Sequence, residues 1–212
     1  MLYMDLLVFF IAMLAYKALD RRLFFFFVHV LVGILVVIIS DYTAAQGNNV
    51  YMSYLFAPFE VIVISAALFP PRSRKRHRQV VWALIIFCLM INPLEGIWLQ
   101  DGFSRYNSIT YVLVNSLLGG LGVYHMTYLR YSAPVANLAT VPTFWMALGV
   151  AVYHIGLFLV WSFMRFAQDN SMTLLWQLTL VREVVVYLTL ILWIIGFWMA
   201  RKSLYRTETT LH

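Results

Sequence analysis

The residues of this sequence that are best suited to chemistry are ionisable side chains standing inside long apolar runs. His29, Glu60 and His154 each have mostly apolar neighbours on both sides, and Asn92 adds an amide in a similar setting. At a helical rise of 1.5 Å per residue, they lie roughly 10 to 18 Å from the nearest basic or turn residue. Ionisable groups at that depth in a bilayer are costly and rare, so each one is a candidate functional residue.

Glu60 offers the most specific chemistry of this midplane group. It ends the segment YLFAPFE, where Pro58 removes one backbone hydrogen bond and can kink the surrounding helix. A carboxylate beside a histidine could relay protons or coordinate a metal ion. The alternative is a neutral side chain that hydrogen-bonds between helices. The sequence leaves both interpretations open.

A second group of polar residues lies roughly 22 to 28 Å from the basic residues by the same helical rise. Its members are Asp5, Glu95, Asn115, Arg182 and Glu183. An arginine keeps its charge, so Arg182 needs a carboxylate or water, and we expect Asp5 or Glu95 to pair with it. The group predicts an outward-facing polar pocket for a ligand. The alternative is a salt bridge that only holds helices together.

Three histidines raise the question of a cofactor. Two histidines on facing helices can ligate haem, and His29, His125 and His154 are the candidates for haem or for a metal ion. However, their expected depths differ, and the sequence contains no Cys-x-x-Cys-His motif. We therefore predict neither haem nor a metal cofactor.

The elements that must position these residues are membrane-spanning helices. Hydrophobic residues make up 63% of the 212 residues and charged residues only 11%, against roughly 45–50% and about 25% in soluble domains. Runs of about 20 apolar residues match the thickness of a bilayer. We predict an all-α, polytopic membrane helix bundle that forms a single transmembrane domain over residues 1–212. Its seven predicted helices span residues 2–19, 22–40, 49–69, 80–100, 108–130, 141–166 and 173–200.

The basic residues predict how this bundle is oriented. They gather at alternate breaks between the predicted helices, whereas the other breaks carry Arg105, Arg165 and the acids Asp41, Asp101 and Asp169. Because basic residues favour the cytosolic side, the N-terminus is predicted outside and the C-terminus in the cytosol. The net charge of +6 then comes mostly from basic residues that keep these segments on the cytosolic side. The residues on the cytosolic side are Lys17, Arg21, Arg22, Arg72, Arg74, Lys75, Arg76, Arg78, Arg130, Arg201, Lys202 and Arg206.

The densest basic cluster suggests a lipid contact. A cluster of this kind beside a membrane can bind anionic lipid, although anchoring of the topology is the plainer explanation. Apart from the bilayer itself, we expect a membrane or cytosolic signalling partner and no nucleic acid. The cluster consists of Arg72, Arg74, Lys75, Arg76 and Arg78.

Short motifs give a resemblance to a family. The chain contains YLFAPFE at residues 54–60, Phe144-Trp145 at the expected start of one helix and Gly196-Phe197-Trp198 near the expected end of another. In these features it resembles small, uncharacterised bacterial seven-helix membrane proteins. The resemblance covers most of the chain and implies a fold but no activity. We accordingly expect a multi-pass protein of the cell membrane, in a bacterium the inner membrane.

Three functions fit these observations. The leading hypothesis is a receptor-like or sensory protein whose outward polar pocket binds a ligand and which acts with a separate signalling partner. The rival is a proton-coupled small-solute transporter or channel that uses Glu60, His29 and His154. The third is an intramembrane metal-dependent hydrolase built from the same groups. An enzyme is not favoured, because no phosphate-binding loop, His-Glu-x-x-His motif or nucleophile elbow appears.

Overall fold

The computed structural model of the chain describes residues 2–45, 51–69, 75–99, 108–132 and 137–209. Every regular element in these ranges is a helix, as predicted, and each predicted span overlaps one α-helix, although the first α-helix ends well before its predicted span does. Short 3₁₀ or π-helical turns also occur: η1 (Tyr16–Ala18), η2 (Glu95–Leu99) and η3 (Leu138–Thr140). The α-helices are α1 (Leu2–Leu14), α2 (Arg21–Ala44), α3 (Tyr51–Leu68), α4 (Lys75–Leu94), α5 (Ser108–Ser132), α6 (Pro142–Asn170) and α7 (Met172–Thr209).

The helices have the length and composition of a membrane protein. In the described part of the chain, five of them are long and apolar enough to cross a bilayer. Large apolar side chains such as Phe10, Trp176 and Leu180 are more than half exposed on the bundle surface, where lipid would cover them. Two further apolar stretches are shorter, Tyr3–Leu14 and Met52–Leu68. The five long stretches are Arg21–Ala44, Arg78–Trp98, Ser108–Tyr131, Pro142–Asn170 and Met172–Ser203.

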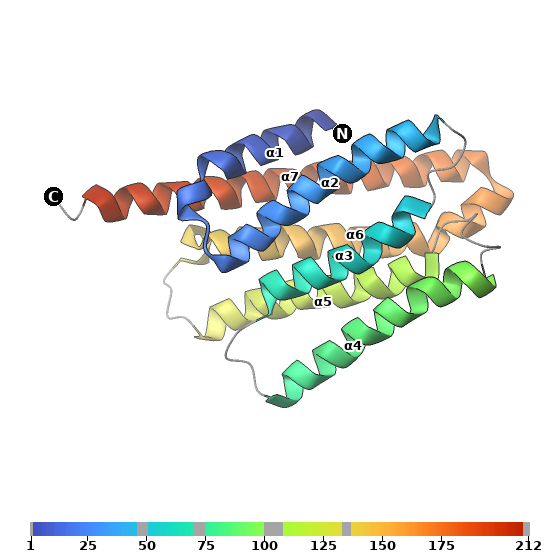
Figure 1. Cartoon of the computed structure of the whole chain (residues 1–212), viewed down its shortest axis with the longest axis horizontal. Helices are drawn as coiled ribbons and strands as arrows, with labels where there is room; N and C mark the ends of the chain where they lie inside the picture. Colours follow the sequence, from blue (N-terminus) through green and yellow to red (C-terminus); the bar gives the residue numbers. More distant parts are fainter. Residues whose placement is uncertain (1, 46–50, 70–74, 100–107, 133–136, 210–212) are drawn as a thin grey trace.

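The helices run roughly side by side along one long axis (Figure 1). The most extensive packing joins α5 to α6 and α6 to α7, while α1 packs on α2 and α7. Helix α3 contacts α2 and α5, and α4 lies at the edge of the bundle against α3 and α5 (Figure 1). Arg21, Arg130 and Arg201 all lie at one end of the bundle, hereafter the basic end. The start of α3 and the end of α6 lie at the opposite end.

Glycines allow the central helices to approach closely. A Cβ on Gly122 of α5 would lie 2.9 Å from backbone atoms of α6, and one on Gly119 would lie 3.1 Å from the Ile155 side chain. Between α6 and α7, a Cβ on Gly149 would lie 2.5 Å from Trp193. The sequence predicts this role for Gly119, Gly120 and Gly122, but Gly120 faces open space. Close packing therefore depends on the other two.

The first helix is shorter than predicted, and this changes the position of Asp5. Helix α1 ends at Leu14, and Asp20 then caps α2 by accepting hydrogen bonds from the backbone N–H groups of Arg22 and Leu23. Asp5 is thus about 14 Å from the end of its helix by the helical rise. His29 is about 12 Å from the start of α2 by the same measure. The prediction of a continuous helix over 2–19, which placed Asp5 in a different layer from His29, is wrong.

Candidate functional site

The main cavity has a volume of about 360 Å³ and lies between α1, α2, α3, α5, α6 and α7. Helix α4 contributes nothing to its described lining. The cavity brings together residues from both predicted polar groups, because Asp5 and Arg182 share it with His29, Glu60 and His154. The cavity therefore draws residues from both expected layers, although Glu95, Asn115 and Glu183 do not line it.

The cavity lining follows the helical repeat on three helices. Residues spaced three or four apart lie on the same face of a helix, and the lining residues have this spacing. On α3, Met52, Phe56, Glu60 and Ile64 form a single stripe. The stripe on α2 contains His29, Gly33, Val36, Val37 and Ser40, and the stripe on α7 contains Arg182, Val186, Thr189, Leu190 and Trp193.

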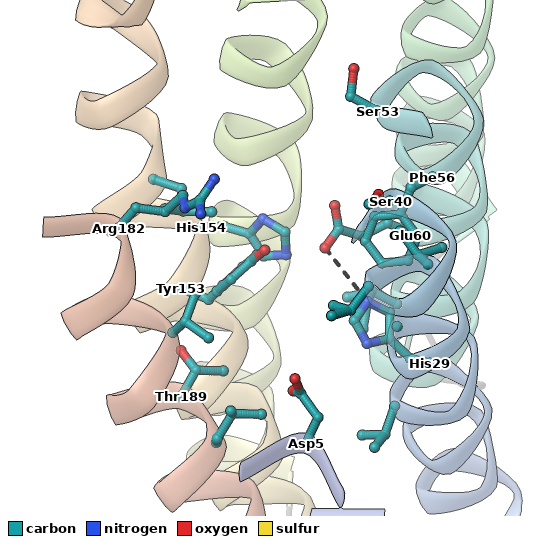
Figure 2. Close-up of a pocket in the computed structure, with 18 of the residues that line it drawn as sticks. Asp5, His29, Ser40, Ser53, Phe56, Glu60, Tyr153, His154, Arg182 and Thr189 are labelled. Atoms are coloured by element: carbon teal, nitrogen blue, oxygen red, sulfur yellow. Dashed lines mark ion pairs between the residues drawn. The ribbon is translucent and has the colours of Figure 1, made fainter. Parts of the chain in front are cut away.

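His29 and Glu60 form the centre of one cavity wall. The His29 Nε2 atom lies 3.5 Å from Glu60 Oε1, and both side chains are largely buried. Three aromatic rings surround the imidazole of His29, with centroid distances of 5.6 Å to Phe56, 6.4 Å to Phe59 and 5.4 Å to Trp193. Figure 2 shows the Glu60 carboxylate projecting from this wall toward α6 and α7. Glu60 therefore lies beside a histidine, and this histidine is His29.

Several buried polar atoms of the cavity make no hydrogen bond. Within the described residues, these are Asp5 Oδ2, Glu60 Oε1 and both ring nitrogens of His29. Buried polar groups are satisfied in the great majority of cases, so each exception requires an explanation. All of these atoms belong to residues that line the cavity. Water or a ligand in the cavity is the available partner.

The opposite wall carries His154 and Arg182. His154 donates from Nδ1 to the side-chain oxygen of Asn115, 2.8 Å away, and its ring meets Tyr153 edge-on. Arg182 donates to Glu183 at 2.9 Å. Figure 2 shows His154 and Arg182 on this side, facing Glu60 across the cavity, while Asp5 enters from α1. Asn115 accepts this hydrogen bond from His154 but does not itself line the cavity.

The partner of Arg182 differs from the prediction. The sequence analysis expects a salt bridge from Arg182 to Asp5 or Glu95, whereas the salt bridge joins it to its neighbour Glu183. Both side chains remain about one third exposed. Adjacent helical residues can pair because long side chains bend toward each other despite their different directions. The carboxylate partner of the Arg182 guanidinium is therefore on the same helix, α7.

The cavity is polar at one end and closed by apolar side chains at the other. Ser40, Asp41 and Ser53 line it near the end opposite the basic end. Toward the basic end, Phe26 and Trp193 meet edge to face at 5.5 Å, and Phe197 beyond them is fully buried. These side chains belong to one continuous apolar core. The cavity therefore extends from one end of the bundle to about its middle.

Asn92 lies outside the cavity and repairs a backbone defect. Pro58 has no N–H group, so it leaves the carbonyl of Tyr54, four residues earlier, without its helical partner. The Asn92 side chain donates to this carbonyl at 2.7 Å. The contact also ties α4 to α3. Asn92 was grouped with the midplane candidates, but this bond gives it a structural role.

Glu95 and His125 also satisfy backbone groups. The two carboxylate oxygens of Glu95 accept hydrogen bonds from the backbone N–H groups of Ile109 at 3.0 Å and Thr110 at 2.7 Å. Free N–H groups at the first turn of a helix commonly need such a partner. His125 Nδ1 donates to the Leu68 carbonyl near the end of α3, 2.6 Å away. Neither residue lines the cavity.

No metal-ligand set forms in the part of the chain that the structure describes. A group of three or more His, Cys, Asp or Glu side chains positioned to hold a metal ion is not found there. His29 and His154 share the cavity, but His125 does not. The hydrolase hypothesis, which requires at least three converging ligands, consequently has no ligand set in these residues.

The predicted lipid cluster is only partly described. Arg72 and Arg74 lie outside the described residues. Lys75 and Arg76 begin α4, and Arg78 is exposed one turn further along that helix. The described part of the cluster thus lies at the basic end.

Some cavity residues were missed by sequence reasoning. The cavity is also lined by residues that the sequence analysis did not select as site candidates, namely Gly33, Asp41, Tyr153 and Thr189. The signal that could have found Gly33 is its spacing, because it lies four residues after His29 on the same helical face. No spacing in the sequence indicates Tyr153, because adjacent residues of a helix point in different directions and Tyr153 directly precedes His154.

The arrangement can bind a small polar molecule. It offers unpartnered acceptors, two histidines, an arginine with its own counter-ion and several aromatic faces within one enclosed space. Comparison with protein-family models, curated proteins and solved structures gave no match. The geometry of the cavity is accordingly the basis for assigning a function.

Proposed function

We propose that the chain crosses the membrane seven times, with its N-terminus outside the cell and its C-terminus in the cytosol. Five helices are suited to a full crossing, and α1 and α3 would complete the set as shorter spans. The orientation is supported by Arg21, Arg130 and Arg201 at the basic end, because basic residues favour the cytosolic face. In this orientation the polar end of the cavity faces outward.

On this basis the protein is a receptor-like membrane protein that binds a small ligand from outside. The observation that carries this proposal is the cavity itself, which carries Ser40, Asp41 and Ser53 at one end and Glu60 further in, and which is closed by Phe26 and Trp193. Its volume of about 360 Å³ falls within the range of small-molecule sites, about 300–1,000 Å³. A receptor needs such an outward pocket and a closed inner half.

Helix α7 provides the connection from the cavity to a signalling partner. Arg182 and Trp193 line the cavity, and the same helix continues to Thr209. Its 38 residues extend about 57 Å at 1.5 Å per residue, and its end projects past the rest of the bundle (Figure 1). A shift of α7 on ligand binding would move this cytosolic projection, where we place the contact with a separate partner.

Cysteine labelling tests this function directly. Gly33 lines the cavity, and an added Cβ there would meet no atom within 4 Å, so Gly33→Cys should fold normally. The natural cysteine, Cys88, is first replaced by serine. We expect a membrane-impermeant thiol reagent to label Gly33→Cys in intact cells. Leu23→Cys, in the apolar core on the same helix, is the control and should not be labelled from outside.

The second candidate is the proton-coupled transporter. It is favoured by one observation, the buried His29–Glu60 contact at 3.5 Å inside a cavity. A transporter must open this site to both sides in turn. Labelling of Gly33→Cys in inverted vesicles as well as in intact cells would support transport. Labelling from outside alone supports the receptor, and labelling from neither side contradicts both.

A further inference from the structure

We propose that the ligand of this cavity is a small organic cation whose ammonium group binds Glu60, in the cavity that Asp5 also lines. The inference rests on the proposed function, since it assigns a ligand class to the same outward cavity. It follows from the charge, the unpartnered atoms and the aromatic lining of the site.

The charge of the lining favours a cation. Asp5, Asp41 and Glu60 line the cavity, whereas Arg182 is its one described lysine or arginine. The positive charge of Arg182 is already balanced by Glu183, 2.9 Å away. A proton on His29 would balance Glu60 in the same way. The carboxylates of Asp5 and Asp41 would still remain, so the cavity carries a net negative charge in either case.

The unpartnered atoms place the ammonium group. Glu60 is only 2% exposed and its carboxylate projects into the cavity, yet Oε1 accepts no hydrogen bond from the described residues (Figure 2). Asp5 is less buried as a residue, but its Oδ2 atom is likewise buried without a hydrogen bond. An ammonium group carries N–H donors and a positive charge, and charge-assisted hydrogen bonds are stronger than neutral ones. It would give Glu60 Oε1 a hydrogen-bond donor that the described residues do not provide.

The aromatic lining suits the rest of the ligand. Phe56, Tyr111, Tyr153, Trp161 and Trp193 contribute to the cavity walls. Aromatic faces attract cations and bind apolar surface. An inorganic cation would gain little from these rings, and the described residues contain no group of three or more His, Cys, Asp or Glu side chains that converge to hold a metal ion. An amine with an aromatic or aliphatic body uses both parts of the lining.

An anionic ligand fits the site less well. It would have to displace Glu183 from Arg182 and would approach the carboxylates of Asp5 and Glu60. Asp41 near the polar end of the cavity would also repel it on entry. A cleft lined by one sign of charge concentrates the opposite ion and accelerates its entry. The same field therefore selects cations at the mouth and in the interior.

The test compares two thiol reagents at one cysteine. Gly33→Cys in the Cys88→Ser background is treated in intact cells with trimethylammonium-ethyl methanethiosulfonate and, separately, with the anionic sulfonatoethyl reagent. Each rate is divided by the rate of the same reagent with mercaptoethanol in solution. We expect the corrected rate of the cationic reagent to exceed that of the anionic one by roughly tenfold or more. The ratio does not depend on the amount of folded protein.

Matched variants locate the source of the preference. Glu60→Gln and Asp5→Asn each remove one cavity carboxylate with little change in size, and each should lower the rate ratio several-fold. Asp169→Asn removes a carboxylate that does not line the cavity, and it should leave the ratio unchanged. Benzylammonium should slow labelling of Gly33→Cys, whereas neutral benzyl alcohol and anionic benzoate should not.

The outcomes separate the ligand class from the proposed function. Reaction with both reagents at equal corrected rates, or faster reaction with the anionic one, overturns the cation while leaving an outward-open cavity. Failure of benzylammonium to protect, or equal protection by benzoate, also overturns it. If neither reagent reacts, the open cavity fails together with the ligand assignment.

Discussion

Two carboxylates of nearly equal burial behave in opposite ways in this molecule. Glu95 is 1% exposed and Glu60 is 2% exposed. Glu95, beside α4, accepts hydrogen bonds from two backbone N–H groups of α5. Glu60, on the cavity wall, has an oxygen, Oε1, that accepts no hydrogen bond from the described residues and lies 3.5 Å from His29 Nε2. Burial alone therefore does not distinguish a structural polar residue from a functional one.

The same contrast extends to the neighbours of these two residues. Asn92 and His125 bind backbone carbonyls of α3, so they complete hydrogen bonds that helix ends or a proline leave open. Asp5 and His29 keep buried polar atoms without partners at the cavity. The bundle itself provides partners for Glu95, Asn92 and His125 Nδ1, whereas the cavity retains atoms of Asp5 and His29 that a ligand or water would satisfy. Three variants and one chemical modification can break or sharpen this comparison.

The largest effect is expected for Glu95→Ala. The substitution leaves the N–H groups of Ile109 and Thr110 without their acceptor in a buried setting, at a cost of about 2–3 kcal/mol. Unfolding in mixed micelles of increasing denaturing detergent measures this loss. Glu95→Gln retains one acceptor and should lose about half as much. A stability equal to that of the wild type would show that Glu95 is not structural.

A smaller effect is expected for Asn92→Ala, and it should depend on Pro58. Removing the amide leaves the Tyr54 carbonyl unsatisfied, at a cost of about 1–2 kcal/mol. Pro58→Ala restores an N–H group that can bond to this carbonyl. The double variant should therefore be more stable than the sum of the single changes predicts, by about 1 kcal/mol. Strict additivity in a double-mutant cycle would argue against this pairing.

The smallest effect on stability is expected for Glu60→Gln. The carboxylate gives Oε1 no hydrogen bond to lose, so the free energy of unfolding should change by less than about 1 kcal/mol. The same variant should change the charge preference of labelling at Gly33→Cys. A large loss of stability without any change in that preference would assign Glu60 to the structural group.

Much of the fold could be predicted from the sequence. The apolar runs end at charges, prolines and glycines, and the resulting spans coincide closely with the helices from α2 to α7. The exception is α1, which ends at Leu14 although the predicted span continues past Lys17 to Leu19. The cap formed by Asp20 on α2 requires a turn before it. Hydrophobicity does not contain this information.

The site could be predicted only in part. Depth along each run identified His29, Glu60, His154 and Arg182 as candidates, and the structure places all of them in one cavity. Depth also selected Glu95, because it does not reveal which way a side chain points or which backbone group lies opposite. Those facts depend on helix packing, which the spacing within one helix does not determine.

Carbodiimide modification of the unaltered protein tests the central contrast most directly. A water-soluble carbodiimide and a small amine are added to the outer side of intact cells, and peptide mass spectrometry then compares the carboxylates. We predict that Glu60 and Asp5 are modified, and that Glu95 is spared because backbone N–H groups occupy both of its oxygens. Modification of Glu95 in preference to Glu60 would contradict the assignment of the cavity as the ligand site.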